Sequence, residues 1–278
     1  MSRSVLEEAS NRMETSDTDG RRCTKTGLWL RASQRTTCWR IAKSSWGALG
    51  PLQRPNEGDR REWGRYDVPG HRTVYSASPL EASYGEALAI YRTKFQDDGP
   101  MLADLFDDVA PGSGSLLDAV REDWAERNHM QPGRVPQGWR QDRLVYELSL
   151  PANGWFIDIE RAESIAVIGA ALQHQFVTLG IDSLTTAELR GSRREVTTMV
   201  ADWLRGQTLD DGTLPHGIMF GSKHDSSWHC WAIWLRAVDD GKTKAAEPTK
   251  ATKGSEIDPC EHNPALRHIV NLFNLKCF

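Results

Sequence analysis

The chain has 278 residues, of which 39% are hydrophobic and eleven are tryptophan. This length suits one large domain with appendages or two small domains, and the tryptophan content favours a packed core. The formal net charge is −4, from 34 basic and 38 acidic residues, so no strong global field attracts nucleic acid or an anionic membrane.

Cysteine usage and hydropathy indicate the compartment. The five cysteines are widely spaced and form no CxxC pair, which argues against a disulfide framework or a zinc ribbon. The longest apolar run, residues 165–172, is too short to span a bilayer, and residues 1–20 lack the apolar core of a secretory signal. We therefore expect a cytoplasmic protein with reduced thiols and no membrane contact.

Composition divides the chain into three parts. Residues 1–36 are rich in Ser, Thr and Arg without a sustained period, and we expect a flexible N-terminal extension there. Residues 37–239 are the expected globular domain. Residues 240–278 are expected to form a low-complexity linker and a short amphipathic segment, because apolar residues recur at helical spacing between 265 and 273.

Strands and helices are mixed inside the globular part. In chain order, the pattern predicts a strand at 72–77, helices at 78–93 and 115–127, strands at 143–150 and 155–159, helices at 160–172 and 195–207, and strands at 216–222 and 228–238. The first helix carries a capping-box pattern, with Ser78 as N-cap, Pro79 at the first helical position and Glu81 at the third. This order predicts an α+β fold with a mixed or antiparallel central sheet and surrounding helices.

The helix predicted at 78–93 carries one isolated carboxylate, Glu86. On a helical wheel its neighbours one turn away are Ala82, Ser83, Ala89 and Ile90, none of which can pair with it. Two interpretations stay open. Glu86 is a solvated surface charge, or it is a functional carboxylate on a floor of small residues that a ligand can approach.

Three further polar residues have the same double interpretation. Tyr75 comes ten residues after Arg65 and eleven before Glu86, in a strand where tyrosine usually packs in the core. Arg65 lies in a loop, where arginine is usually solvated, although its guanidinium suits bidentate phosphate binding. Ser222 ends a predicted strand, a pattern equally common at functional sites and in turns. It has no GxSxG surroundings, so serine hydrolase chemistry is disfavoured.

Other motifs are weak. His216, His224, His229 and Cys230 match no strong zinc spacing, so we expect no metal site. The segment GSGSLL (112–117) lacks the lysine of a phosphate-binding loop and follows no predicted strand. The basic cluster at 58–65 is more typical of a solvated face than of a nucleic-acid patch, so no direct nucleic-acid contact is expected.

Together, Arg65, Tyr75, Glu86 and Ser222 resemble the RES-domain family, the toxins of bacterial Xre–RES toxin–antitoxin pairs. The similarity covers residues 37–238. It is carried, in this order, by CWRI (38–41), GRYDVPGHRTVYSASPLEASYGE (64–86), VADWL (200–204) and HGIMFGSKHDSSWHCWAIW (216–234). The chain has Tyr66 and Asp67 where many members have Trp or Phe followed by Asn. Arg40 in CWRI is a second arginine that can reach the ligand.

The resemblance implies an ADP-ribosyltransferase-like fold and a toxin that degrades NAD, with NAD as its substrate and no cofactor beyond it. The nicotinamide–ribose bond would be cleaved, with water or phosphate as acceptor. Glu86 would stabilise the oxocarbenium-like charge, Tyr75 would stack on nicotinamide, Arg65 or Arg40 would bind pyrophosphate, and Ser222 would bond the ribose or amide. An Xre-type antitoxin is the implied partner, with an oligomer of the two as one expected form. A non-catalytic nucleotide-binding sensor and a protein ADP-ribosyltransferase stay open as alternatives.

Overall fold

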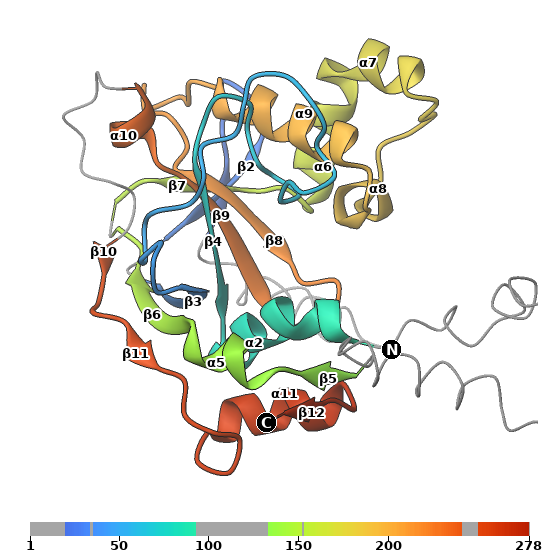
Figure 1. Ribbon diagram of the computed structural model, residues 1–278. Helices are drawn as coiled ribbons and strands as arrows, with labels where there is room; N and C mark the ends of the chain where they lie inside the picture. Colours follow the sequence, from blue (N-terminus) through green and yellow to red (C-terminus); the bar gives the residue numbers. More distant parts are fainter. Residues whose placement is uncertain (1–19, 34–35, 93–132, 152, 241–249, 278) are drawn as a thin grey trace, which may run out of the picture.

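The computed structural model describes residues 20–33, 36–92, 133–151, 153–240 and 250–277 (Figure 1). Its strands are β1 (Gly20–Arg22), β2 (Trp29–Ala32), β3 (Thr37–Lys43), β4 (Thr73–Ser78), β5 (Arg134–Val135), β6 (Arg143–Ser149), β7 (Trp155–Asp158), β8 (Gly217–Gly221), β9 (His229–Trp234), β10 (Lys250–Ala251), β11 (Ser255–Glu256) and β12 (Lys276–Cys277). Its helices are α2 (Leu80–Leu88), the 3-10 helix η2 (Ala89–Tyr91), α5 (Gln137–Gln141), α6 (Ala162–Ala171), α7 (Gln173–Thr178), α8 (Thr186–Arg190), α9 (Arg194–Arg205), α10 (Arg236–Asp240) and α11 (Pro264–Leu272). The helix expected at 115–127 and the segment 112–117 lie outside these residues.

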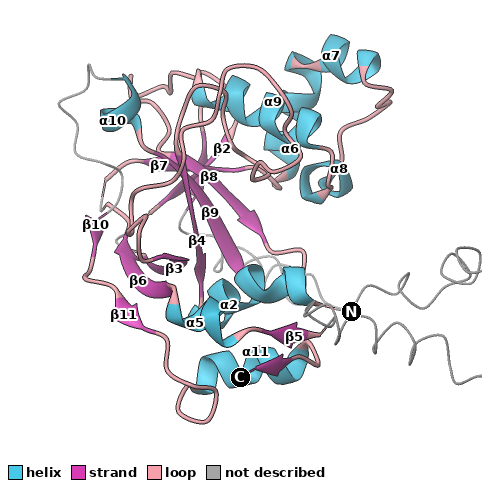
Figure 2. Ribbon diagram, viewed as in Figure 1, coloured by secondary structure: helices cyan, strands magenta, loops and turns pink. Residues whose placement is uncertain are grey.

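One mixed sheet organises the described residues. Its strand order is β1-β2-β7-β8-β9-β4-β3-β6-β10, with β11 also pairing with β6. The β7–β8 pair is parallel and the other pairs of this sheet are antiparallel. Helices α6 to α9 gather on one side of the strands, whereas α2, α5 and α11 gather at the other end (Figures 1 and 2). The predicted α+β class with a mixed central sheet is therefore confirmed.

Apolar side chains fill both faces of the sheet. Five tryptophans are at most 6% exposed: Trp63, Trp139, Trp228, Trp231 and Trp234. Helix α9 buries Val196, Val200 and Leu204 at helical spacing, as its sequence predicts. No helix in the described part of the chain combines the length and apolarity that crossing a membrane requires.

The expectation of a flexible extension up to residue 36 is wrong for its last part. Strand β1 pairs with β2, and β2 pairs with β7, so residues 20–32 form one edge of the main sheet. Cys23, Leu28 and Leu30 are fully buried in the core. Three apolar residues among polar neighbours are enough to dock this short hairpin, although they give no sustained period.

The expected linker after residue 240 is also partly structured. Strands β10 and β11 both pair with β6 and extend the opposite edge of the sheet. The amphipathic C-terminal segment forms α11 as predicted, with Leu266 and Ile269 fully buried. Strand β12 then pairs in parallel with β5.

The predicted capping box at the start of α2 is wrong. Ser78 is the last residue of β4 and pairs with His229 of β9, so its backbone stays in the sheet. Pro79 takes the N-cap position, and no side chain caps the helix. The pairing of β4 with β9 therefore fixes where α2 begins.

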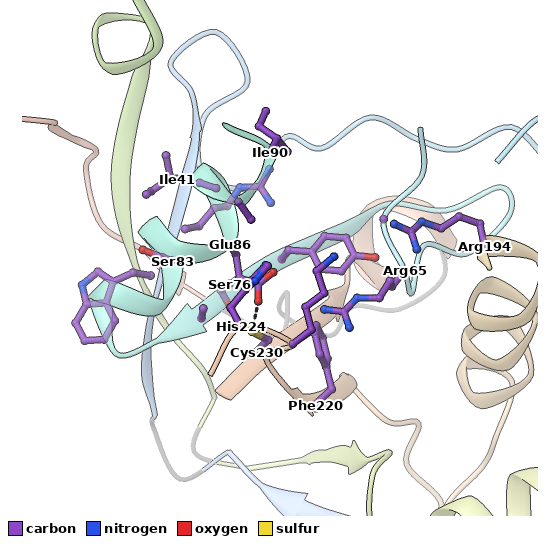
Figure 3. Close-up of a pocket in the computed structure, with 18 residues that line it drawn as sticks. Ile41, Arg65, Ser76, Ser83, Glu86, Ile90, Arg194, Phe220, His224 and Cys230 are labelled. Carbon is purple, nitrogen blue, oxygen red and sulfur yellow. Dashed lines mark hydrogen bonds between the residues drawn. The ribbon is translucent and has the colours of Figure 1, made fainter. Parts of the chain in front are cut away.

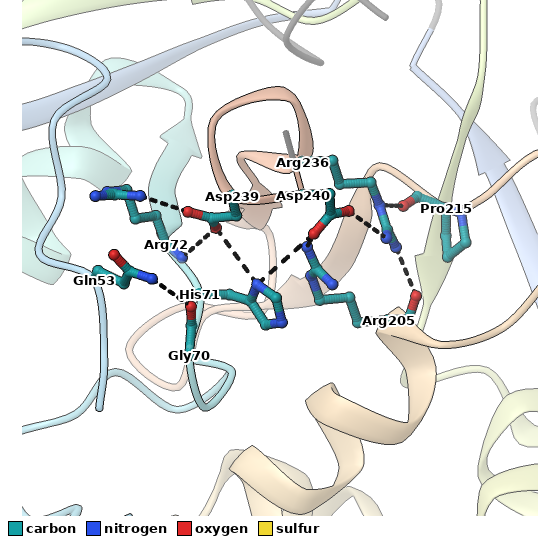
Figure 4. A network of polar contacts seen from close by, with 9 residues as sticks. All are labelled: Gln53, Gly70, His71, Arg72, Arg205, Pro215, Arg236, Asp239 and Asp240. Carbon is teal, nitrogen blue, oxygen red and sulfur yellow. Dashed lines mark hydrogen bonds and ion pairs between the residues drawn. The ribbon is translucent and has the colours of Figure 1, made fainter. Parts of the chain in front are cut away.

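A polar network joins the start of β4 to α9 and α10 (Figure 4). Asp239 is nearly fully buried, and its carboxylate accepts hydrogen bonds from the backbone N–H and the guanidinium of Arg72, both at 2.6 Å. Arg205 pairs with Asp240 at 2.5 Å and accepts, through its carbonyl, a hydrogen bond from Arg236. These ion pairs hold the chain after β9 against the entry to β4.

Gly85 in α2 lies directly against Trp228, and a Cβ at this position would come within 2.2 Å of the indole ring. We expect Gly85→Ala to lower the free energy of unfolding by about 1–3 kcal/mol, because the helix must move away from a packed ring. Urea denaturation measures this. Gly138→Ala is the matched control, since no atom lies within 4 Å of its added Cβ. Equal stability of the two variants would contradict the tight contact.

Candidate functional site

A cavity of about 470 Å³ opens between β3, β4, α2 and the residues that follow β8 (Figure 3). Its wall combines charged, aromatic and small side chains. The lining residues are Trp39, Arg40, Ile41, Gly64, Arg65, Tyr75, Ser76, Ala77, Ser83, Glu86, Ala87, Ala89, Ile90, Arg194, Phe220, Lys223, His224 and Cys230. The volume lies within the range of small-molecule sites, about 300–1,000 Å³.

Arg65, Tyr75 and Glu86 reach this cavity from three successive elements: a loop, strand β4 and helix α2. The Tyr75 hydroxyl accepts a hydrogen bond from the Tyr66 backbone N–H at 2.8 Å, so the strand holds the loop that carries Arg65. Gly64 permits this contact, because a Cβ there would lie 2.5 Å from the Tyr75 hydroxyl oxygen. The spacings of ten and eleven residues therefore bring three side chains to one site.

Glu86 lies on the small-residue floor that the sequence offered as its second interpretation. Ser83, Ala87 and Ala89 line the same cavity, and Glu86 is half-buried rather than solvated. Ser222, only 1% exposed, donates a hydrogen bond from its hydroxyl to Glu86 Oε1 at 2.6 Å. The Ser222 Oγ also accepts a hydrogen bond from the His224 backbone N–H at 3.0 Å. Ser222 thus lies behind Glu86 and orients its carboxylate.

Cys230 approaches Glu86 from strand β9. Its Sγ lies 3.8 Å from Glu86 Oε1, and the thiol is buried (Figure 3). Burial, with the nearby Glu86 carboxylate as the next cause, raises the pKa of Cys230 well above its usual value. The thiol therefore stays protonated at neutral pH and acts as a second, weak donor to Glu86.

The loop around Arg65 holds both Tyr66 and Asp67 through buried contacts. Tyr66 is fully buried, donates its hydroxyl to the Leu189 carbonyl at 2.8 Å and packs edge-on against Phe220. The Asp67 carboxylate accepts hydrogen bonds from Arg54 at 2.5 Å and from the Gly64 backbone N–H at 2.8 Å. Arg54 thus supplies the charge partner that a buried aspartate needs in this position.

Positive charge exceeds negative charge in the cavity. Four cationic side chains line it, namely Arg40, Arg65, Arg194 and Lys223, and Glu86 is its one carboxylate among the described residues. Arg65 rests on the Phe220 ring at 5.0 Å, and Arg194 donates to the backbone carbonyls of Trp63, Gly191 and Ser192. Within the described ranges none of the four forms an ion pair with a carboxylate. Their charge therefore remains available to an anionic ligand.

Arg40 is the most constrained of these cations. Arg40 belongs to strand β3 and is only 8% exposed, and its Nε has no hydrogen-bond partner among the residues that the structure describes. Burial lowers the pKa of Arg40 to about 10. Burial, followed by repulsion from Arg65, also lowers the pKa of Lys223. A buried cation without a partner is costly, and an anion bound beside it would offset that cost.

The structure brings all the predicted site residues together and adds others. Arg40, Arg65, Tyr75 and Glu86 line the cavity, and Ser222 contacts Glu86 from behind. Sequence reasoning missed Arg194, Phe220 and Lys223 as site residues. Phe220 lies two residues after Ile218 on β8, a spacing that predicts a second core residue on the same face. The position of Arg194 predicts only the charged start of a helix. Lys223 directly follows the predicted site residue Ser222, and this adjacency was the one sequence signal that could have indicated it.

The histidine and cysteine cluster is dispersed. His216 contacts the Asn153 carbonyl and the Phe156 ring, whereas His224 lines the cavity. His229 is exposed and Cys230 is buried, as expected for adjacent residues of a strand. Within the described ranges, no three His, Cys, Asp or Glu side chains are grouped to hold a metal ion.

Comparison with known proteins gives no match: no protein-family model, no curated protein and no solved structure is similar to this chain. The site must therefore be interpreted from its own geometry.

Substitution of Arg40 should affect stability and anion binding in opposite directions. We expect Arg40→Met to raise the free energy of unfolding of the empty protein by about 1–3 kcal/mol, because it removes a buried charge that has no ion-pair partner in the described part of the chain. The same change should weaken binding of inorganic pyrophosphate. Urea denaturation and calorimetry measure the two effects. Arg72→Met is the control that should lower the free energy of unfolding, because it removes the ion-pair partner of the Asp239 carboxylate. Loss of stability in Arg40→Met would show that the guanidinium has a structural role.

The pH dependence of anion binding follows from the same lowered pKa values. Arg40 is protonated below its pKa of about 10 and loses its charge as the pH rises through that value. Lys223 shifts in the same direction. We expect pyrophosphate affinity to stay level from pH 7 to about 8.5 and to fall towards pH 10 at constant ionic strength. In Arg40→Met the fall should be shallower, and an identical fall would exclude Arg40 as its source.

Proposed function

We propose that this protein cleaves the nicotinamide–ribose bond of NAD, with water or phosphate as the acceptor, as an NAD-degrading toxin of the RES type. The observation that carries the proposal is one oriented carboxylate, Glu86, among cationic side chains that have no carboxylate partners in the described residues. NAD presents the complementary groups: an anionic pyrophosphate and a ribose whose bond to nicotinamide must break. The mixed sheet and surrounding helices are compatible with an ADP-ribosyltransferase-like fold, which is part of the same proposal.

In this mechanism the charge that develops on the ribose is stabilised rather than neutralised by proton transfer. Breaking the bond passes through an oxocarbenium-like ion, and a fixed carboxylate beside the ribose lowers its energy. Glu86 takes this role, with Ser222 and Cys230 holding it in place. Nicotinamide leaves as a neutral group, so no strong general acid is needed.

The remaining groups would hold the two ends of NAD. Arg65, Lys223 and Arg194 bind the pyrophosphate side, and Arg40 supplies a second anion contact. The Tyr75 ring lines the cavity while its hydroxyl is engaged with the loop, which leaves a ring face for the nicotinamide. Ser222 takes a different role from the one implied by the resemblance: it acts through Glu86 and not on the ribose directly.

The toxin role and an Xre-type antitoxin partner rest on the resemblance of residues 37–238. Expression of the chain in a bacterium should arrest growth by depleting NAD in the cytoplasm. The Glu86→Gln variant should be tolerated at equal soluble expression. Harmless expression of the wild-type chain would argue against a toxin and in favour of a nucleotide-binding sensor.

The direct test is release of free nicotinamide from NAD by the purified chain, with and without inorganic phosphate. We expect Glu86→Gln to lower kcat at least about a hundredfold, because it removes the negative charge at the ribose while retaining the side-chain shape. Glu81→Gln is the matched control on the same helix, because Glu81 does not line the cavity. Phosphate dependence of release would identify the acceptor.

Three outcomes would change the assignment. Tight NAD binding without nicotinamide release would identify the sensor alternative. Transfer of label from adenine-labelled NAD to a protein band would identify a protein ADP-ribosyltransferase. Equal turnover by wild type and Glu86→Gln would exclude Glu86 from the chemistry.

A further inference from the structure

The C-terminal segment, residues 263–277, lies outside the region that resembles the RES family, yet it packs on the helix that carries Glu86. Leu266 and Ile269 of α11 are fully buried. Asn263 caps α11 and donates a hydrogen bond from Nδ2 to the Tyr84 hydroxyl at 2.9 Å. Tyr84 precedes Glu86 by two residues on a different face of α2, so this contact fixes the C-terminal segment to the helix that carries Glu86.

The far end of the segment reaches the cavity wall. Phe273, directly after α11, lies under the Arg92 guanidinium at 4.5 Å, and its ring centroid is 5.6 Å from that of His224. The Lys276 backbone N–H donates to the Gly133 carbonyl at 2.7 Å, and the Gly133 N–H donates to the Tyr91 carbonyl at 3.1 Å. The segment is therefore held at both ends of the α2–η2 unit.

His224 is the pocket residue that these contacts fix. Its Nδ1 lies 3.3 Å from the Arg92 Nη1. Arginine can only donate, so Nδ1 is the acceptor and the neutral ring carries its proton on Nε2. Nε2 is buried and has no partner among the described residues. Nε2 therefore lies out of reach of a ligand in the cavity, and His224 lines the cavity through its other atoms.

We propose that the C-terminal segment completes the binding site, with Phe273 and Arg92 as positioning residues that hold His224 in the cavity wall beside Glu86, where it contacts the bound ligand. The identity of that ligand as NAD rests on the proposed function. The positioning of His224 rests only on the contacts of Phe273, Arg92 and Asn263.

The charge state of His224 follows from the groups that face it. Burial lowers its pKa, Lys223, Arg92 and Arg65 act in the same direction, and Glu86 opposes them. His224 is therefore neutral at pH 7. Without the Phe273 ring, water reaches the imidazole, and the pKa of His224 should rise towards its usual value.

A double-mutant cycle tests whether Phe273 acts through His224. We expect Phe273→Ala and His224→Gln each to lower kcat/KM for nicotinamide release on the order of tenfold or more, with no further loss in the double variant. Phe273→Tyr retains the ring and should retain activity. Leu272→Ala is the control, because Leu272 is 53% exposed on the same helix. Independent, additive losses would overturn the inference.

A second measurement separates this inference from the proposed function. The titration midpoint of His224, followed by NMR without ligand, should be higher in Phe273→Ala than in the wild type and unchanged in Leu272→Ala. An unchanged midpoint in Phe273→Ala would overturn the positioning role, whatever the enzyme assay shows. If the wild type releases no nicotinamide, the proposed reaction fails, and the same cycle measured on NAD binding by calorimetry decides the role of His224. If NAD does not bind either, His224 is not part of an NAD site and the inference is overturned.

Discussion

The hydrogen bond from Ser222 to Glu86 joins parts of the chain that are 136 residues apart, and the site depends on it. It exists because β4 pairs with β9, and β9 with β8, so the end of β8 comes beside the helix that follows β4. The pairing of these strands therefore fixes the direction of the Glu86 carboxylate. A carboxylate on a free helix face would be solvated and mobile, whereas here its direction is fixed before any ligand arrives.

The cavity that would bind a ligand also contains a residue that lowers the stability of the empty protein. Among the described residues Arg40 is a buried cation without an ion-pair partner, whereas Cys230 and Ser222 are buried donors directed at one oxygen of Glu86. A buried cation without an ion-pair partner reduces the stability of the empty protein and becomes favourable when an anionic ligand binds beside it. Elsewhere, buried charge is paired: Asp239 has Arg72, and Asp67 has Arg54. The contrast between paired and unpaired charge identifies the cavity as the place where a ligand belongs.

Several elements could be predicted from the sequence because side-chain pattern alone decides them. Alternating apolar residues predicted β6, and apolar residues at helical spacing predicted α9 and α11. A change from strand to helix pattern predicted β4 and α2. The pattern could not give β10 and β11, whose pairing with β6 uses backbone groups and leaves no side-chain signal. It also failed at Ser78, where local capping preference competes with pairing to His229 and loses. Among site residues, Arg65, Tyr75 and Glu86 are close in sequence and were found together, whereas Arg194 and Phe220 are brought to them only by tertiary structure.

Three consecutive residues of α2 face three different parts of the molecule. Tyr84 meets Asn263 of the C-terminal segment, Gly85 meets the Trp228 ring, and Glu86 meets Ser222. Successive residues of a helix are rotated by about 100°, so these neighbours together allow only one rotational setting of the helix. Any route by which this site acquires a different specificity is therefore expected to leave α2 unchanged. Substitutions that change specificity would instead be expected in the cavity wall, at Ile41, Ile90 and Lys223, whose side chains make fewer of the contacts described above.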